Sequence, residues 1–232
     1  MAETIEVTAP APTAPRGGAA ALRRSPAAQL ADAFAAATVQ GERGVAVREV
    51  PFLTQLGVRA VPGSAGAAAV ESALGASLPT GHGRTTTGGG YTLLWVGPDE
   101  FLAVADETPT SAFEDRGPAE AARVGDALGE AGSRAAGAVV DLSANRTTFE
   151  LSGPSALAVL EKGISYDLHP RRFDVGTAIA TVLDHVPVLL WKTGEDTYRV
   201  LPRASFADHV GRWLVDAMRE FAVSDAPAAG VR

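Results

Sequence analysis

The feature that most constrains the fold of this chain is a repeat of the sequence within itself. Ser64-Ala65 opens an alanine-rich helix that leads to Pro79, and Ser155-Ala156 opens a helix that leads to Pro170, in both cases 91 residues further on. Two other segments return at spacings of 96 and 97 residues: LLW at 93–95 and 189–191, and GPDEF at 97–101 as GEDTY at 194–198. A repeat of this length indicates a duplicated subdomain, because solenoid repeats are much shorter.

Both copies have the same predicted order of elements: a strand, a helix, a strand ending in Leu-Leu-Trp, a turn, another strand and a closing helix. The turns contain glycine and aspartate, which tolerate the positive φ of tight hairpins. The closing helix of the second copy, predicted at 205–221, has a single apolar stripe that is typical of a helix packed on a core. The sequence therefore predicts an α+β fold of two mixed-sheet and helix subdomains related by pseudo-twofold symmetry.

The repeat also suggests where the domain begins and ends. The first copy is predicted at about 45–131 and the second at about 138–221, within a single domain over 25–223. Residues 1–24 are rich in Ala, Pro, Thr and Gly without periodicity, and such segments cannot bury enough apolar surface to offset their ordering entropy. We expect flexible tails at 1–24 and 224–232. Ser25, followed by Pro26, is predicted to cap a first helix at 25–37.

Composition excludes several classes of function. The net charge is −7 without a run of lysine or arginine, which disfavours nucleic-acid binding. The apolar runs are far shorter than the roughly 20 residues of a spanning helix, and the first residues do not resemble a secretory signal, so we expect a cytoplasmic protein without membrane association. Cysteine is absent, and the four histidines lack the spacing that would place two ligands on one metal. No metal site is predicted.

One loop has the glycine content of a phosphate-binding loop, the segment TGHGRTTTGGG at 80–90. It lacks the GKS or GKT ending of the nucleotide-binding loop. No predicted strand leads directly into it and no predicted helix leaves it, so the dinucleotide fingerprint is also missing. We predict a mobile loop between a helix and a strand, without a cofactor.

The segment DLSANRTTFELSGPS at 141–155 has the composition of a catalytic strip. Its polar residues alternate with Phe149 and Leu151, however, which is typical of a half-buried strand. Asp141 and Asn145 suit a sharp turn, because their side chains can accept hydrogen bonds from the backbone two residues further on. We therefore predict a structural turn at Asp141 and Asn145, and no catalytic residue.

Two long segments resemble a known family: VVDLSANRTTFELSGPSALAVLEKGISYDLHPRRF at 139–173 and LLWKTGEDTYRVLPRASFADHVGRWLVDAM at 189–218. With LRRSPAAQL, VREVPFLTQLGVRA and LLWVGPDEFLAVA upstream in the expected order, they look like the gamma subunit of heterotetrameric sarcosine oxidase. That family is distantly similar to the folate-binding domain of the glycine-cleavage T-protein. The resemblance implies the fold of that domain.

The resemblance also implies a function and a set of partners. The complex of alpha, beta, gamma and delta subunits oxidatively demethylates sarcosine to glycine, with hydrogen peroxide and either 5,10-methylenetetrahydrofolate or formaldehyde as products. FAD, FMN, NAD, tetrahydrofolate and zinc are implied to belong to the other subunits, and no cofactor to this chain. The leading hypothesis is thus a non-catalytic assembly subunit.

Two other hypotheses stay open. In folate-active relatives one hairpin carries an acidic pair, of which one aspartate assists one-carbon transfer. Here the corresponding segment is TVLDHVPV at 181–188, with a shortened turn and His185 where a second acid is expected. Asp184 alone could mimic that acid in a free-standing folate-dependent aminomethyl or one-carbon transferase. A small-molecule binding module would depend on the glycine-rich loop.

Three arginines are candidates for contact with a partner subunit: Arg146, Arg171 and Arg172. They lie near the ends of the repeated elements. Arginine is enriched at protein interfaces because its planar guanidinium presents a fork of donors. We expect at least one of the three to contact a larger subunit.

Overall fold

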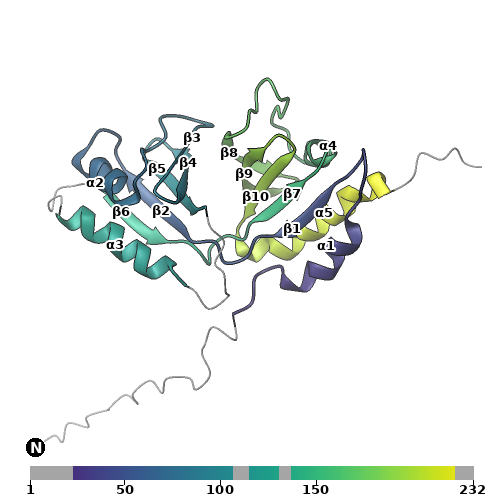
Figure 1. Cartoon of the computed structure of the whole chain (residues 1–232), viewed down its shortest axis with the longest axis horizontal. Coiled ribbons are helices and arrows are strands. Elements are labelled where there is room, and N and C mark those ends of the chain that lie inside the picture. The colour runs from purple at the N-terminus through teal and green to yellow at the C-terminus, as the bar shows by residue number, and fades with distance from the viewer. Residues whose placement is uncertain (1–22, 107–114, 131–136, 223–232) are drawn as a thin grey trace, which may run out of the picture.

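The structure is a computed structural model that describes residues 23–106, 115–130 and 137–222. Its strands form two five-stranded sheets (Figure 1). Sheet 1 has the strand order β3-β4-β5-β2-β6 and sheet 2 the order β1-β7-β10-β9-β8. The strands of sheet 1 are β2 (Gln55–Ala60), β3 (Thr85–Gly88), β4 (Tyr91–Gly97), β5 (Glu100–Ala105) and β6 (Gly137–Asp141). Those of sheet 2 are β1 (Ala46–Glu49), β7 (Phe149–Ser152), β8 (Ala178–Leu183), β9 (Val186–Gly194) and β10 (Thr197–Pro202).

The helices are arranged in the same way around both sheets. Sheet 1 is accompanied by α2 and α3, and sheet 2 by α1, α4 and α5 (Figure 1). The helices are α1 (Ala31–Ala37), α2 (Ala65–Leu74), α3 (Gly117–Glu130), α4 (Ala156–Glu161) and α5 (Ala207–Ala222), with short 3₁₀ turns at Ala28–Leu30 and Ala204–Phe206. Within the described ranges, no helix is both long enough and apolar enough to cross a membrane.

The two copies exchange their first strands. The first copy runs β1-β2-α2-β3-β4-β5-α3 and the second runs β6-β7-α4-β8-β9-β10-α5. Strand β1 pairs with β7 of the second copy, where Ala46 lies opposite Ser152. Reciprocally, β6 of the second copy pairs with β2 of the first, where Asp141 lies opposite Leu56. Each predicted copy therefore completes the sheet of the other.

The predicted α+β fold is confirmed, and so is the correspondence between its halves. Every strand of sheet 1 has a counterpart at the same position of sheet 2, and both LLW strands lead to a hairpin with a register shift near its turn. All strand pairings among the described residues are antiparallel. The sheets are therefore not mixed in direction: the hairpins, the exchanged strands and the β2–β5 and β7–β10 pairs that join them are all antiparallel.

Three apolar clusters hold the layers together. One cluster joins sheet 1 to α2 and α3 through Leu56, Val70 and Val124, and another joins sheet 2 to the helices on its outer face. The third cluster lies between the sheets and includes Leu102 of β5 and Leu201 of β10. Each sheet thus packs one of its faces against helices and part of its other face against the second sheet.

Two local predictions were wrong. Ser25 does not cap the first helix, because its hydroxyl donates to the Glu49 carboxylate at 2.5 Å and the helix begins as a 3₁₀ turn at Ala28. The glycine-rich segment 80–90 is not a loop throughout, because Thr85–Gly88 forms β3 at the edge of sheet 1. The predicted flexible tails, apart from Arg23 and Arg24, lie outside the described residues.

Candidate functional site

The polar strip at 141–155 connects the two sheets, since it contains the end of β6, a turn and β7. The Asp141 carboxylate accepts two hydrogen bonds from Ser143, one from its backbone N–H at 2.9 Å and one from its hydroxyl at 2.6 Å. The Ser143 hydroxyl oxygen in turn accepts from the backbone N–H of Gln55 at 3.1 Å. These bonds tie the turn to β2, so the Asp141 carboxylate is occupied within the fold.

The main chain of Asn145 continues this turn. Its N–H donates to the carbonyl of Leu142 at 2.8 Å, and its own carbonyl accepts from the N–H of Ala204 at 2.9 Å. Arg146 then forms an isolated antiparallel bridge with Arg203. The turn thus holds the segment after β10 against the segment before β7.

Arg146 is half-buried at this junction. Its guanidinium donates to the carbonyl of Leu201 at 3.0 Å. Burial, and secondly the neighbouring charge of Arg203, lower the pKa of Arg146 below its ordinary value. Within 23–106, 115–130 and 137–222, no carboxylate pairs with either arginine. The junction therefore carries two positive charges beside each other.

A hollow of about 500 Å³ opens next to these arginines, on the face of sheet 1 that is turned away from its helices. Its apolar lining includes Gly57, Val96, Leu102, Val140, Leu142 and Leu189. Its charged lining consists of Arg59, Glu100, Arg146 and Arg203. Arg59 is paired with Asp99 at 3.2 Å and with Glu100 at 2.7 Å, so the unpaired charge of the hollow comes from the other two arginines.

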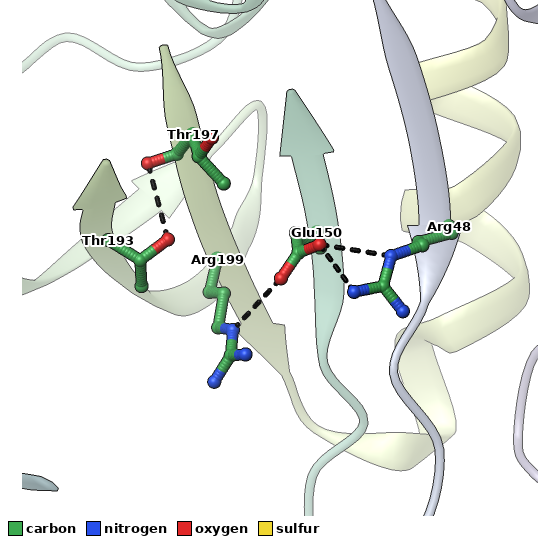
Figure 2. A network of polar contacts seen from close by, with 5 residues as sticks. All are labelled: Arg48, Glu150, Thr193, Thr197 and Arg199. Atoms are coloured by element: carbon green, nitrogen blue, oxygen red, sulfur yellow. Dashed lines mark hydrogen bonds and ion pairs between the residues drawn. The ribbon is translucent and has the colours of Figure 1, made fainter. Parts of the chain in front are cut away.

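The corresponding face of sheet 2 carries a charged row, consisting of Arg48, Glu150 and Arg199 on three neighbouring strands (Figure 2). Both nitrogens of the Arg48 fork donate to one oxygen of Glu150, at 2.9 and 2.5 Å. Arg199 donates to the other oxygen at 3.3 Å and lies 5.3 Å from the centre of the Trp191 ring. All three charged side chains of this row therefore have a partner of opposite charge on the face of sheet 2.

The same three positions of sheet 1 carry no charge. Counted from the matching hairpins β4–β5 and β9–β10, the counterparts of the charged row are Val140, Gly57 and Leu102, here called the apolar row. All three line the hollow. The duplicated sheets have thus diverged at equivalent positions, one into an ion-pair network and the other into an apolar surface.

The other two candidate interface arginines lie elsewhere. Arg171 and Arg172 are exposed in the connection between α4 and β8, where their backbone N–H groups donate to His169. No hydrogen bond or ion pair involves either guanidinium among the residues that the structure describes. The structure therefore brings Arg146 together with Arg203, a residue that the sequence analysis did not single out.

The Asp184-His185 segment is the two-residue turn of the β8–β9 hairpin. Leu183 lies opposite Val186 in the last pair before the turn, and Asp184 has a positive φ of 55°. The His185 side chain is 93% exposed and its Nε2 lies 3.5 Å from the Asp184 carboxylate. Neither residue lines the hollow beside Arg146 and Arg203 or the other main pockets of the described ranges.

The glycines at the end of the glycine-rich segment are explained by packing. A Cβ at Gly88 would lie 2.4 Å from the carbonyl oxygen of Gly75, and one at Gly89 would lie 1.8 Å from that of Leu74. The strand hairpin thus lies directly on the last turn of α2. These glycines allow two backbones to lie in close contact. Close packing of this kind requires glycine just as a phosphate-binding loop does.

A polar pocket of about 550 Å³ lies at the other end of sheet 1, beside α3. The Tyr91 hydroxyl donates to Glu120 at 2.9 Å, and Arg123 donates to the same carboxylate oxygen at 2.7 Å. Burial, followed by the bond to Glu120, raises the pKa of Tyr91 to about 12. No group of three or more His, Cys, Asp or Glu residues in the described ranges is arranged to hold a metal ion.

Comparison with known proteins adds the decisive observation. The model of the sarcosine oxidase, gamma subunit family matches residues 59–220. This chain belongs to that family. Among its relatives, the gamma subunit of sarcosine oxidase from Corynebacterium sp. (strain U-96) is 51% identical over 205 residues, which cover 88% of this chain and 94% of the relative. The gamma subunit from Arthrobacter sp. is 52% identical over 202 residues, which cover 87% and 92%.

Solved structures place the family among known folds. A chain of heterotetrameric sarcosine oxidase from Corynebacterium sp. U-96, in complex with pyrrole 2-carboxylate, matches with a TM-score of 0.79 and 50% identity, covering 89% of this chain and 100% of that one. Glycine cleavage system aminomethyltransferase T from Bartonella henselae matches with a TM-score of 0.52 and 16% identity, covering 80% and 48%. The predicted resemblance to both proteins is confirmed, for the second one at the level of the fold.

Proposed function

We propose that this chain is the gamma subunit of a heterotetrameric sarcosine oxidase and that its role there is to hold the assembly together, without a catalytic group of its own. One observation carries the proposal. A chain of a solved heterotetrameric sarcosine oxidase is matched over its whole length at 50% identity. At that level of identity over a full chain, the surfaces that meet the other subunits are expected to be retained along with the fold.

The proposed complex converts sarcosine, oxygen and water into glycine, formaldehyde and hydrogen peroxide, or delivers the carbon to tetrahydrofolate as 5,10-methylenetetrahydrofolate. In this proposal the alpha, beta and delta subunits hold FAD, FMN, NAD, tetrahydrofolate and zinc. This chain contributes contact surface for the other subunits and no catalytic group. Stable assemblies of this kind commonly bury on the order of 2,000 Å² or more.

The contacts of the polar residues support a structural role. The Asp141 carboxylate is occupied by Ser143, and the Glu150 carboxylate lies between two arginines. A general acid or base needs a free position from which to reach a substrate proton. The two acids of the strip are thus engaged in holding a turn against β2 and in pairing charges across three strands of sheet 2.

A folate-dependent aminomethyl or one-carbon transferase is the alternative, because the fold is shared with an aminomethyltransferase. In that case Asp184 would be the acid. Its position at an exposed hairpin tip, next to His185, favours the assembly role, because a carboxylate that assists group transfer works best where water is excluded.

The test combines co-expression with ligand titration. The other three subunits are expressed with and without this chain, and the flavin content and subunit composition of the purified complex are measured. We expect a complete, flavin-containing oxidase only when the chain is present. The isolated chain is titrated in parallel with FAD, FMN, NAD and tetrahydrofolate by calorimetry, and we expect no binding. Full assembly and activity without the chain, or micromolar affinity for any of the four ligands, would contradict the proposal.

A further inference from the structure

The hollow of sheet 1 is open to the outside at Val140, whereas Leu102 and Leu189 in its lining belong to the core between the sheets. Val140 of β6 is 56% exposed, although its neighbours Leu142 and Leu102 also line the hollow. Single exposed valines are common, but an exposed valine at the mouth of an apolar concavity indicates a surface that another molecule covers.

The edge of sheet 1 beside the hollow is open. In the described part of the chain, β6 pairs with β2 alone, and its sequence from Gly137 to Asp141 is almost entirely apolar. Its counterpart in sheet 2, β1, carries Arg48 and Glu49, and α1 packs alongside it (Figure 1). Proteins protect edge strands with charges or with a covering element, because unpaired N–H and C=O groups invite another strand. β1 thus carries two charges at its edge and β6 only Asp141, while α1 packs against β1 and α3 packs against β6.

Within the described ranges, the charges of the hollow that have no partner of opposite sign are both positive. Arg146 is half-buried and bonds to a carbonyl, while Arg203 beside it is exposed, and no carboxylate among the described residues pairs with either. A partly desolvated guanidinium gains most from a carboxylate, with which it forms two parallel hydrogen bonds. The complementary group is therefore a carboxylate that arrives together with apolar side chains.

We propose that β6 and the hollow, lined by the apolar row and by Arg146 and Arg203, are the surface on which another subunit docks. The docking segment lies along β6, packs an apolar side chain against Val140 and Leu142, and presents a carboxylate to the two arginines. This inference rests on the proposed assembly role and names the surface that performs it. The space over Gly57 is filled by Leu142 of this chain, because a Cβ at Gly57 would lie 2.6 Å from Leu142 Cδ1, so a partner would meet the hollow at the exposed Val140.

The test is a pair of matched substitutions in the full chain, co-expressed with the other subunits. Val140→Asp adds a charge to the hollow, and Val182→Asp is its control, since Val182 is 45% exposed on β8, the edge strand of the other sheet. We expect Val140→Asp to weaken binding of the chain to the other subunits by about tenfold or more, and Val182→Asp to change it by less than about twofold. The thermal midpoint of each isolated variant, within about 2 °C of the wild type, shows that it is folded.

The charged half of the surface is tested in the same way. Arg203→Glu reverses an exposed charge of the hollow, and Arg171→Glu reverses an exposed charge of the α4–β8 connection. We expect only the first to weaken assembly by about tenfold or more. Hydrogen exchange on the wild-type chain provides an independent measurement, because the backbone amides of Gly137–Asp141 should exchange more slowly in the complex than in the isolated chain.

The outcomes separate this inference from the proposed function. If the wild-type chain assembles and Val140→Asp and Arg203→Glu assemble equally well, the surface is wrong and the assembly role stands. If Val140→Asp and Val182→Asp weaken assembly equally, the effect is not specific to the hollow and the inference fails. A homodimer of the isolated chain that Val140→Asp dissociates would identify a second copy as the occupant and overturn it. Failure of the wild-type chain to assemble at all would overturn both proposals.

Discussion

Arg48 on β1 and Glu150 on β7 lie directly opposite each other, and both nitrogens of the arginine fork donate to one carboxylate oxygen. The pair joins the first copy of the repeat to the second. Since Glu150 also accepts from Arg199, a single carboxylate balances two guanidinium groups on a half-buried sheet face.

Glu150→Gln should therefore destabilise the protein. The substitution keeps the size of the side chain but leaves two neighbouring arginines without a negative charge between them, of which Arg199 is 16% exposed. We expect a loss of about 2 kcal/mol in the free energy of unfolding, which corresponds to roughly 4–8 °C in the thermal midpoint. Glu195→Gln in the exposed β9–β10 turn is the control. Equal midpoints for the two variants would contradict this account of the charged row.

The turn at Asp141 gives a second prediction. Asp141→Ala removes both hydrogen bonds from Ser143 and should cost about 1–2 kcal/mol, because each bond contributes about 1 kcal/mol. Asn145→Ala should cost less than about 0.5 kcal/mol, since its contacts at the turn are made by the main chain. Urea unfolding measures both values. Turnover per bound flavin in the assembled complex should stay near normal for both variants, and a large loss of turnover would instead indicate a catalytic strip.

The contact between the glycine-rich segment and α2 gives a third prediction. A Cβ at Gly89 would collide with the carbonyl oxygen of Leu74, and the residue also has a positive φ of 55°. Gly89→Ala should destabilise by about 3 kcal/mol or more, because backbone atoms must move. Gly90 has a φ of 83° but open space around its Cβ position, so Gly90→Ala isolates the cost of the dihedral, about 1 kcal/mol. The difference between their thermal midpoints measures the clash, and an absence of any difference would refute it.

The fourth prediction concerns the dependence of stability on pH. The bond from Arg123, followed by that from Tyr91, lowers the pKa of Glu120 below its ordinary value of 4.5. A carboxyl group whose pKa is lowered by folding stabilises the protein above its ordinary pKa, and this stabilisation is lost as the pH falls through the lowered value. Glu120→Gln should thus be less stable than the wild type at pH 7, and the difference should shrink on acidification. Thermal midpoints between pH 7 and about pH 2 test the trend.

Tyr91 should add the opposite dependence at alkaline pH. Its pKa is raised to about 12, so the wild type should lose stability as the pH rises from 10 towards 12, while Tyr91→Phe should not show that loss. Absorbance of the tyrosinate at alkaline pH follows the titration directly. A midpoint near 10 in the folded protein would show that the bond to Glu120 does not hold the proton.

The sequence was sufficient to predict the fold class and the duplication, because both depend on features that recur along the chain. The LLW strands and the turns after them repeat at spacings of 96 and 97 residues, and the closing helix has a clear apolar stripe. The exchange of β1 and β6 was not predictable in the same way. Which strand becomes the neighbour of another depends on contacts between residues about 100 positions apart, and no local pattern records them.

The candidate site was predicted only in part, for a related reason. Asp141 and Arg146 stood out as polar residues in a strand context, but Arg203 and Gly57 did not. Gly57 reads as an ordinary glycine within a strand, and its significance appears only when the register brings it between Val140 and Leu102. Similarly, the charged row becomes visible only when three strands are aligned. The glycine-rich segment misled because close backbone packing and phosphate binding both require residues without a side chain.

The exchanged first strands imply something about each copy taken alone. A chain with only one copy would keep its own strand order but would lack the edge strand of its sheet, and it could fill that position by giving its first strand to an identical partner. The smallest complete form of such a unit is therefore a domain-swapped homodimer, in which both sheets are bound to be the same. Fusing the two copies into one polypeptide removes that constraint. A substitution such as glutamate for glycine within a sheet then has to be compatible with only one of the two sheets.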